Sequence, residues 1–567
     1  MNDLQQLKVI TSDRKRIIVE APAGYGKTYT MVAMIEEWLK KHKIANHSKI
    51  LCVSFSVAAA KRMKEEVVKK FKDSNYYGRI EATNFHGLCR KILKKYLNLL
   101  SLVSLDVDFD SIETCATKDL DKSKFSDDDL SKIQEFDKKI KEAEIDENMI
   151  FANIDEYNKI LLTKLSVTNT LNYNSIITLT LQIFKNYPQL KEAYSFYYGG
   201  ICVDEFQDTN ILHLTLIHQL FGKKNRVVYF GDSMQQIYRF MGSVPSVIDK
   251  ELFSNEKWDY IKLTTNYRFP NNANMKRLDY CLRKQIENSK EQFASKKVKL
   301  KVLESENILK QCTMIWKTLE KIRNKDKNST IGILFRQTRG KNSGTILEIL
   351  EKLCMNNSVE IFNATFSDED ESFIEFHEIV KKVYQKKKRY IFQDIESFYD
   401  DIASCTSNLN NNASYMLLLK AFMKKIIQDK LDFVSRDKSI MECLDSYLLK
   451  QSIADIESKV VLSTIHGAKG LEWDYIILAN FQDGEFPNYY DIKEMGKVSI
   501  EKSVSVENID KFKEILNTFY VAVTRAKKDI YVSYSKKSYS GWNEYLKNTS
   551  ISFLSKLPFF ECEIIRK

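Results

Sequence analysis

The sequence contains no apolar run approaching ~20 residues, which is the length that a membrane-spanning helix needs. Its ten cysteines are scattered, with no CxxC pair and no close Cys/His pairing, which argues against a zinc site and against a disulfide framework. The first residues lack the basic and apolar regions of a signal peptide. These absences argue against a membrane protein and a disulfide-rich secreted domain, and they predict a cytoplasmic protein with no membrane partner.

Glycine is absent from two long stretches, 88–198 and 345–466, which are rich in Lys, Glu, Leu and Ile at helical spacing. Both are expected to be mainly helical insertions. The remainder alternates short apolar runs with helical segments, and this alternation is typical of parallel sheets. The expected strands are 17–19, 50–55, 201–203, 227–230, 260–263, 298–302, 331–335, 460–462, 475–478 and 530–532. The pattern predicts an α/β fold with two cores, each interrupted by a helical insertion.

The charge balance leans to the basic side, with 87 Lys and Arg against 76 Asp and Glu, a formal net charge of +11. An excess of this size on a chain of 567 residues permits a nucleic-acid partner without demonstrating one. The length is enough for roughly three or four domains.

A glycine-containing loop stands between a short apolar run and a helical pattern near the N-terminus; it reads Ala21-Pro22-Ala23-Gly24-Tyr25-Gly26-Lys27-Thr28. Strand, glycine loop and helix are the arrangement that a P-loop requires. Gly24 and Gly26 let backbone N–H groups converge on phosphate oxygens, while Lys27 supplies positive charge to the β- and γ-phosphates. The Thr28 hydroxyl is placed to bind Mg²⁺. The alternative is an ordinary glycine turn before a helix.

A P-loop also needs a carboxylate partner, and Asp204 and Glu205 directly follow a buried apolar run. Asp204 can hold Mg²⁺, and Glu205 can accept the proton of an attacking water molecule. In isolation such an acidic pair would more often be a solvated turn. Following a buried strand in a chain with a P-loop, the pair indicates a hydrolytic site for ATP.

Several further segments, taken in order, resemble the motifs of the UvrD/Rep/PcrA-type superfamily 1A DNA helicases. They read Ile50-Leu51-Cys52-Val53-Ser54-Phe55-Ser56, Thr83-Asn84-Phe85-His86-Gly87, Gly231-Asp232-Ser233-Met234-Gln235-Gln236-Ile237-Tyr238-Arg239-Phe240, Asn266-Tyr267-Arg268, Thr464-Ile465-His466-Gly467-Ala468-Lys469-Gly470-Leu471-Glu472 and Tyr520-Val521-Ala522-Val523-Thr524-Arg525-Ala526. Each segment alone is moderate evidence. Their order along nearly the whole chain, apart from the two insertions, makes the resemblance close to decisive.

The resemblance implies an ATP- and Mg²⁺-dependent enzyme that moves 3′→5′ on single-stranded DNA. It implies catalytic roles for Lys27, Glu205, Gln235, Arg268 and Arg525. Nucleotide contacts are implied for Gln6, for 21–28, and for Tyr29, Tyr267, Arg268, Glu472 and Arg525. Thr28 and Asp204 would hold the metal. Tyr29 stands where the family usually has Arg, so Tyr29 and Tyr267 could enclose adenine between two rings, or the adenine contact could be weaker.

Binding of single-stranded DNA needs stacking faces together with phosphate contacts. The expected DNA-binding residues are Phe55, Ser56, Phe85, His86, Tyr238, Phe240, Thr464 and His466. Core packing is the alternative for each aromatic side chain, and Phe85 fits that alternative best. The DNA partner would be a single strand or a junction between single and double strands.

The resemblance also divides the chain into two RecA-like cores with their insertions. The expected parts are 1–95 and 186–268 for core 1, 96–185 for its insertion, 269–345 and 457–567 for core 2, and 346–456 for a reduced second insertion. Without glycine, the second insertion cannot contain the family's Gly-Ile-Gly element that contacts duplex DNA. The chain is in this respect similar to the helicase components of Gabija-type anti-phage systems. Two functions therefore stay open: a DNA motor in repair, recombination or defence, and a DNA- or nucleotide-sensing ATPase that regulates a partner nuclease.

Overall fold

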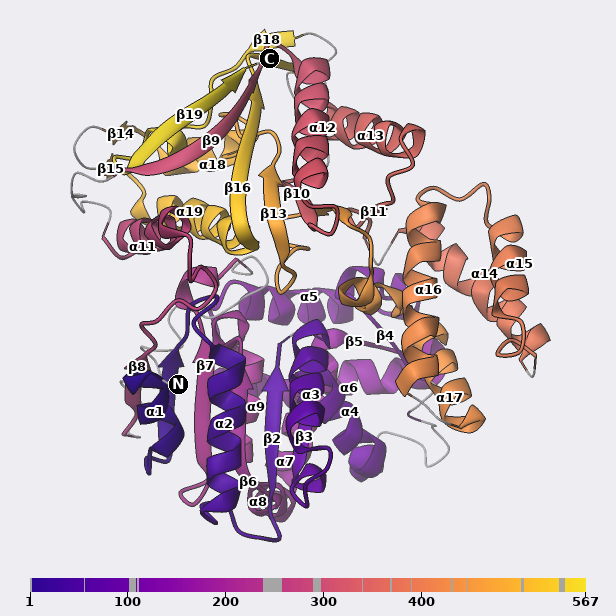
Figure 1. The fold of residues 1–567 in the computed structure, drawn as a ribbon. Coiled ribbons are helices and arrows are strands. Elements are labelled where there is room, and N and C mark those ends of the chain that lie inside the picture. The colour runs from indigo at the N-terminus through magenta and orange to yellow at the C-terminus, as the bar shows by residue number, and fades with distance from the viewer. Residues whose placement is uncertain are drawn as a thin grey trace. The chain divides into compact units, whose positions relative to one another are not determined.

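The structure is a computed structural model of the chain (Figure 1). It describes residues 3–55, 57–100, 109, 112–237, 257–288, 297–338, 340–367, 370–388, 390–429, 432–445, 447–500, 504–539 and 546–566; at 57, 58, 442, 445, 451 and 454 it describes the backbone alone. The chain forms two compact units, Met1–Arg268 and Phe269–Lys567. Each is described by itself below.

The first unit is built on a six-stranded parallel sheet with the order β3-β2-β6-β7-β1-β8. Its strands are β1 (Arg16–Glu20), β2 (Lys49–Ser54), β3 (Ile80–Asn84), β6 (Tyr198–Asp204), β7 (Arg226–Gly231) and β8 (Asp259–Lys262). The strand that leads into the P-loop, β1, lies between β7 and β8. Because all strands run in one direction, the loops that follow them gather at one edge of the sheet.

Both faces of this sheet are buried, because successive side chains point to opposite sides. Ile17 and Val19 on β1 face one core, which is closed by α1 (Leu4–Thr11), α2 (Lys27–Lys40) and α3 (Val57–Phe71). Ile18 faces the other core, together with Leu51 and Val53 on β2. That second core includes α4 (Phe85–Tyr96) and α9 (Ile211–Leu220).

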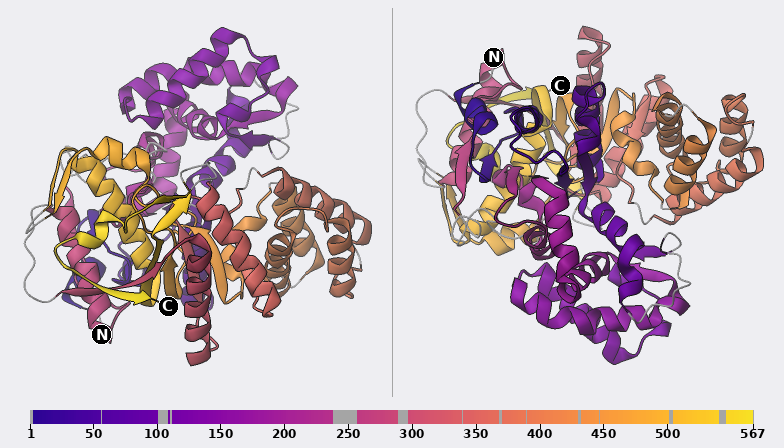
Figure 2. Two further views of the ribbon diagram at one scale, coloured as in Figure 1. Left: turned by 90° about the horizontal axis from the view of Figure 1, so that it is seen from above. Right: turned by 90° about the horizontal axis from the view of Figure 1, so that it is seen from below.

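The first insertion is mainly helical, as expected, and its buried side chains continue the second core of the sheet. It contains the helices α5 (Asp127–Lys141), α6 (Glu147–Thr168), α7 (Tyr173–Asn186) and α8 (Pro188–Tyr197), and the short strands β4 (Glu113–Cys115) and β5 (Thr170–Asn172). Figure 2 shows these helices as a group at one side of the sheet.

The second unit has a seven-stranded parallel sheet with the order β11-β12-β10-β13-β16-β9-β19. Its strands are β9 (Val298–Ser305), β10 (Ile331–Phe335), β11 (Ile361–Asn363), β12 (Val460–Thr464), β13 (Trp473–Leu478), β16 (Ala526–Ser535) and β19 (Phe560–Arg566). Two small antiparallel pairs stand apart from it, β14 (Val498–Ile500) with β15 (Val504–Val506), and β17 (Lys537–Tyr539) with β18 (Leu546–Asn548).

Helices of the second unit fall into two sets. Those packed around the sheet are α11 (Ala273–Glu287), α12 (Ile308–Lys325), α13 (Lys341–Asn356), α18 (Tyr489–Met495) and α19 (Ile509–Thr524). The second insertion supplies α14 (Glu371–Lys387), α15 (Ile395–Cys405), α16 (Asn412–Asp429) and α17 (Phe433–Asp445), which form a group of their own (Figures 1 and 2).

The predicted α/β class with two large parallel sheets is confirmed, and it is consistent with two RecA-like cores. Three sheet strands were not predicted: β3, β11 and β19. The first carries the polar sequence Ile-Glu-Ala-Thr-Asn and the second is three residues long, so neither gives a clear apolar run. The third lies at the edge of its sheet, and most of its side chains are exposed.

Candidate nucleotide and DNA site

The residues expected to bind nucleotide in the first unit lie at the carboxyl ends of three strands. The P-loop follows β1, Asp204 is the last residue of β6, and Asp232 follows β7. These strands are neighbours in the order β6-β7-β1. Parallel pairing thus brings together segments that are about two hundred residues apart in the sequence.

The two glycines of the P-loop have left-handed backbone conformations that favour glycine, with φ 84° at Gly24 and 79° at Gly26. A Cβ at Gly24 would lie 2.5 Å from the Cβ of Arg268, and one at Gly26 would lie 2.5 Å from Nε2 of Gln6. Gly26 is also the N-cap of α2, so the helix begins at Lys27 with its N–H groups directed toward the loop. The loop is therefore shaped for close approach of an anion.

Gln6 and Tyr267 lie side by side next to Gly26. The Tyr267 hydroxyl is 3.2 Å from Oε1 of Gln6 and 3.3 Å from a carboxylate oxygen of Asp3, and its backbone N–H donates to Gly24 O at 2.8 Å. Asp3 also caps α1 by accepting from Gln6 N at 2.7 Å. The Tyr267 ring is 42% exposed and the Tyr29 ring 58% exposed. The structure thus brings together Gln6 and Tyr267, two of the residues expected to contact adenine, and both tyrosines are exposed.

Lys27 forms ion pairs with both acidic residues of the β6 end, at 2.9 Å to Asp204 and in shorter contact with Glu205. Burial alone would lower the pKa of Lys27, but attraction to the two carboxylates outweighs it and raises the pKa above its ordinary value. Burial raises the pKa of Asp204, and the Lys27 charge opposes that shift. Lys27 is therefore charged, and its single positive charge offsets part of the negative charge of the acidic pair.

Glu205 has a left-handed backbone, with φ 54°. For a non-glycine residue this conformation is strained, by an amount on the order of 1–3 kcal/mol. It persists because the residues after it form a compact turn, in which Asp208 N donates to Glu205 O at 3.0 Å. The turn directs the carboxylate to Lys27, as a general base beside a P-loop would require.

A residue absent from the sequence predictions, Gln207, links Glu205 to the next motif. Its amide donates to Oε2 of Glu205 at 2.5 Å, and its carbonyl oxygen accepts from Asp232 N at 3.1 Å. Asp232 in turn accepts from the Gln235 side chain at 2.9 Å. Gln235, the expected γ-phosphate sensor, is thus joined to the expected base through hydrogen bonds. The signal in the sequence was that Gln207 lies two residues after Glu205.

A second residue that was not predicted, Glu20, fixes the start of the same motif. Its carboxylate accepts from both the backbone N–H and the hydroxyl of Ser233, at 3.1 and 2.9 Å. Next to it, Ala21 N donates to Gly231 O at 2.6 Å. The P-loop and the Gln235 motif are therefore held together by direct hydrogen bonds.

Arg268 lies against the P-loop, because its Cβ and Nε are the atoms nearest to a Cβ built on Gly24. Its backbone N–H donates to the side chain of Asn266 at 2.9 Å. The expected nucleotide residues Gln6, Lys27, Tyr267 and Arg268 thus all border one loop.

Arg525 belongs to the second unit, where it is the C-cap of α19. Its guanidinium donates to Val521 O at 3.1 Å, to Leu471 O at 3.4 Å and to the Thr524 hydroxyl at 3.1 Å. These bonds orient the guanidinium within the second unit. The role expected for Arg525 stays a prediction.

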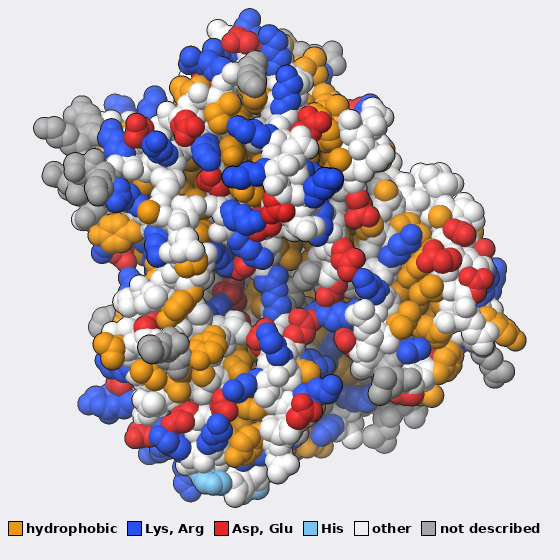
Figure 3. Space-filling model, viewed as in Figure 1, with side chains coloured by type: hydrophobic (Ala, Val, Ile, Leu, Met, Phe, Trp, Pro, Cys, Tyr) orange, Lys and Arg blue, Asp and Glu red, His pale blue; other side chains and the backbone are white. Residues whose placement is uncertain are grey.

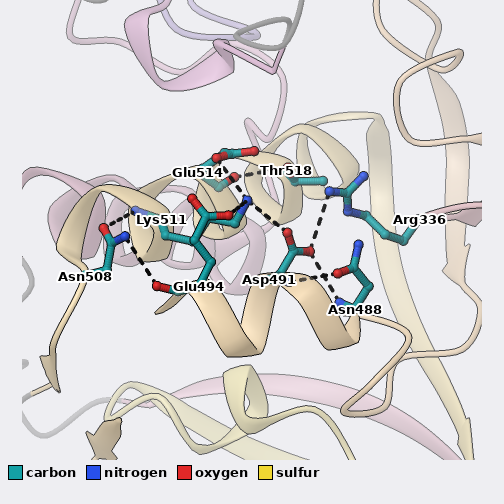
Figure 4. A network of polar contacts seen from close by, with 8 residues as sticks. All are labelled: Arg336, Asn488, Asp491, Glu494, Asn508, Lys511, Glu514 and Thr518. Carbon is teal, nitrogen blue, oxygen red and sulfur yellow. Dashed lines mark hydrogen bonds and ion pairs between the residues drawn. The ribbon is translucent and has the colours of Figure 1, made fainter. Parts of the chain in front are cut away.

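The helix that carries Arg525 is anchored at its other end by a charged network (Figure 4). Lys511 on α19 forms ion pairs with Asp491 and Glu494 on α18, both at 3.1 Å, and with Glu514 at 3.3 Å. Asp491 is also 3.6 Å from Arg336, which follows β10. This network fixes the N-terminal part of α19 to α18 and to the residue that follows β10.

The other expected residues of the second unit surround the turn after β12. The Thr464 hydroxyl accepts from Gly467 N at 2.9 Å, and Lys469 N donates to His466 O at 3.1 Å. Glu472 is exposed just before β13. Their contacts to nucleotide or DNA stay predictions.

The expected DNA contacts of the first unit follow β2 and β3. Phe55 and His86 are partly exposed, whereas Phe85 is fully buried. Phe85 packs on His213 with 4.4 Å between ring centres, so core packing, the alternative noted for it, describes it in this structure. Ser56, Tyr238 and Phe240 lie outside the described residues. On the face of the molecule in Figure 3, Lys and Arg side chains are intermixed with Asp and Glu.

The residues expected to hold Mg²⁺ offer oxygen ligands next to a place that accommodates a cation. The Lys27 ammonium group lies against the carboxylates of Asp204 and Glu205, so a cation is accommodated there. Thr28 is the second residue of α2, and hydroxyl and carboxylate oxygens are the donors that Mg²⁺ prefers. The donor set fits the metal. Separately, no helix in the described part of the chain is long and apolar enough to cross a membrane.

Comparison with known proteins agrees with this geometry. Residues 1–256 match the UvrD/REP helicase N-terminal domain, and residues 345–537 match the UvrD-like helicase C-terminal domain. A probable DNA helicase II homolog of Mycoplasma genitalium is 25% identical, over 94% of this chain and 84% of the relative. The ATP-dependent DNA helicase PcrA of Bacillus subtilis is 23% identical, over 94% and 83%, and that of Staphylococcus aureus strain MRSA252 is 22% identical, over 98% and 86%. The chain therefore belongs to the UvrD/Rep/PcrA-type family of ATP-hydrolysing DNA helicases.

Proposed function

We propose that this protein is a motor that moves 3′→5′ along single-stranded DNA, driven by hydrolysis of Mg-ATP between two RecA-like cores. The observation that carries the hydrolytic part is the contact of Lys27, in the loop after β1, with Asp204 and Glu205 at the end of β6. The direction of movement rests on family resemblance.

In this proposal the P-loop backbone and Lys27 bind the phosphates, while Thr28 and Asp204 hold Mg²⁺. The metal neutralises charge on the phosphate oxygens when it is bound. Glu205 accepts the proton of the attacking water, and Gln207 keeps its carboxylate oriented when Lys27 turns to the phosphates. Gln235, joined to Glu205 through Asp232 and Gln207, senses the γ-phosphate.

The second core contributes Arg525 to the transition state and Glu472 to the ribose side of the nucleotide. Closure of the two cores on ATP, and opening after hydrolysis, would move the DNA contacts of one core past those of the other. Among the described residues, the proposed contacts to the DNA strand are Phe55 and His86 in the first core and Thr464 and His466 in the second.

Two measurements test this function. Single-stranded oligonucleotide at saturation should raise the ATPase rate at least about tenfold, as coupling between two sites predicts. Displacement of streptavidin should be rapid from a 5′-biotinylated strand and slow from a 3′-biotinylated one, because a 3′→5′ motor runs toward the 5′ end. An ATPase rate that DNA leaves unchanged would contradict a motor, and the opposite preference would contradict the direction.

A sensing ATPase that regulates a partner nuclease in anti-phage defence is the second candidate. The feature that favours it is the small second insertion, α14–α17, which lies in a stretch without glycine and so lacks a Gly-Ile-Gly duplex contact. Strand displacement by the purified chain distinguishes the two. A DNA-stimulated ATPase that cannot displace a strand alone favours the sensor, and efficient displacement favours the motor in repair or recombination.

A further inference from the structure

Five aromatic rings lie close together near the carboxyl ends of β2, β3 and β6. His213 lies at their centre, with ring centres 5.5 Å from Phe55, 4.4 Å from Phe85 and 6.1 Å from His86. His86 also lies 5.9 Å from the Tyr173 ring. His213 is only 2% exposed, while Phe55 and His86 reach the surface. A buried ring is thus in contact with two side chains proposed to bind DNA.

The same histidine fixes the segment that follows Glu205. His213 is the third residue of α9, and its Nδ1 accepts from Asn210 N at 3.3 Å, while the Asn210 side chain accepts from His213 N at 3.1 Å. This reciprocal cap ties the start of α9 to the turn at 205–210. Any displacement of the His213 ring is therefore applied to the backbone that positions Glu205.

One polar atom of this arrangement, Nε2 of His213, has no hydrogen-bond partner in the part of the chain that the structure describes. Because Nδ1 of His213 accepts a hydrogen bond, its Nε2 carries the proton of the neutral ring, and Nε2 is buried with no acceptor among the described residues. His86 Nε2 donates to Tyr173 O at 3.2 Å, so in the neutral ring Nδ1 of His86 is an acceptor. Burial lowers the pKa of both histidines, which keeps the rings neutral.

We propose that His213 is a positioning residue that transmits DNA occupancy at Phe55 and His86 to the Glu205 segment. It has two states. In the first state, Nε2 of His213 has no acceptor among the described residues. In the second state, a nucleobase lies against Phe55 and His86, the His86 ring is displaced toward His213, and Nδ1 of His86 accepts a hydrogen bond from Nε2 of His213. The two ring centres are 6.1 Å apart, and a hydrogen bond needs ~3 Å between donor and acceptor atoms, so the His86 ring has to move toward His213. The proposal rests on the proposed DNA-stimulated ATPase.

The second state is favoured because a buried N–H without an acceptor is unfavourable, and the new bond removes that penalty. DNA selects this state because it acts on His86 directly. The cap then transmits the displacement to residues 205–210. Binding of a nucleobase and hydrolysis with Glu205 as general base therefore depend on the same turn. His213 itself contacts neither the nucleotide nor the strand.

The experiment compares variants of the full chain. His213→Asn keeps an acceptor for Asn210 N and removes the ring, whereas His213→Phe keeps a ring and removes the cap. His213→Asn, which keeps the cap, should leave the DNA-independent ATPase rate within about twofold, whereas His213→Phe, which removes the cap, should lower that rate. Both should lower the stimulation by a saturating oligonucleotide at least about fivefold. The matched control is His218→Asn, on the same helix, where the histidine pairs with Glu147 at 2.9 Å; it should keep full stimulation.

Hydrogen exchange supplies a readout that a merely structural role would not change. In the wild type, oligonucleotide should slow exchange of the amides at 205–214, and in both His213 variants this effect should be lost although the oligonucleotide still binds. Unchanged stimulation in His213→Asn would overturn the proposal, as would an equal loss of basal and stimulated rates in both variants. A wild type without stimulation would instead refute the proposed function itself.

Discussion

Replacement of the expected general base, Glu205→Gln, should stop ATP turnover while preserving the binding of ATP and DNA. The amide has the size of the carboxylate but cannot accept the proton of the attacking water. General-base catalysis contributes at least ~100-fold, so turnover should fall by that factor or more, which corresponds to about 2.7 kcal/mol of transition-state stabilisation. Asp204 and its 2.9 Å contact with Lys27 are untouched, so the phosphate and metal residues stay in place.

The contacts of Glu205 also set the expected cost in stability. One oxygen meets Lys27 and the other accepts from the Gln207 amide at 2.5 Å. In the variant, the new amide nitrogen of residue 205 faces one of these two donors. The side-chain amide of Gln207 cannot rotate to offer its oxygen instead, because that oxygen accepts a hydrogen bond from Asp232 N. One hydrogen bond is lost, at a cost on the order of 1 kcal/mol. The fold should therefore persist under assay conditions.

The assay is steady-state ATP hydrolysis at saturating single-stranded DNA, together with binding of a fluorescent ATP analogue and urea unfolding. Glu37→Gln is the matched control: Glu37 lies on the P-loop helix and pairs with Lys41 at 2.6 Å on the surface. Its turnover should stay within about twofold of wild type, since surface ion pairs contribute little. Turnover of Glu205→Gln within a few-fold of wild type would show that another group accepts the proton.

Three further predictions test other parts of the site and fold. Arg525→Ala should lower the DNA-stimulated ATPase by roughly 10³-fold with nearly unchanged ATP affinity, because its charge is needed in the transition state; normal hydrolysis would exclude it from the phosphate site. Gly24→Ala should abolish ATP binding, because its Cβ would lie 2.5 Å from that of Arg268 at φ 84°, while Gly78→Ala, with no atom within 4 Å, should bind normally. Burial would raise the pKa of Glu304, but hydrogen bonds from Tyr534, Arg566 and Lys536 lower this pKa to about 2. The ionised Glu304 carboxylate therefore stabilises the fold fully above the ordinary pKa of glutamate, and this stabilisation is lost as the pH falls toward 2. The urea midpoints of wild type and Glu304→Gln should accordingly differ at pH 7 and converge near pH 2.

Local sequence predicted the parts of the site in which chemistry and backbone conformation coincide. Gly24 and Gly26 could be assigned because only glycine tolerates the left-handed conformation and the close neighbours found there. Asp204 could be placed at the end of a strand because it directly follows an apolar run, and β6 does end there. The α/β class followed from the alternation of apolar runs and helical segments, since that alternation requires parallel strands.

Residues that act through neighbours distant in sequence could not be predicted. Gln207 and Glu20 are polar, buried and bonded to residues 25 and 213 positions away, and a local pattern cannot show such partners. Strand β3 was missed because its sequence, Ile-Glu-Ala-Thr-Asn, contains no apolar run. Its pairing with β2 cannot be recognised from a local pattern. Phe85 was the aromatic side chain for which core packing fitted best, and it is fully buried, whereas Phe55 is partly exposed.

The contacts of Lys27 bear on the order in which nucleotide and Mg²⁺ bind to the site. In the structure its single positive charge contacts both carboxylates and reduces the repulsion between them. Phosphates that attract Lys27 away leave two like charges at the end of β6, which is unfavourable unless a metal cation replaces it. Nucleotide and Mg²⁺ should therefore bind as a unit, with each making the site more favourable for the other. Gln207 is what keeps Glu205 in place during this exchange, because its hydrogen bond does not depend on Lys27.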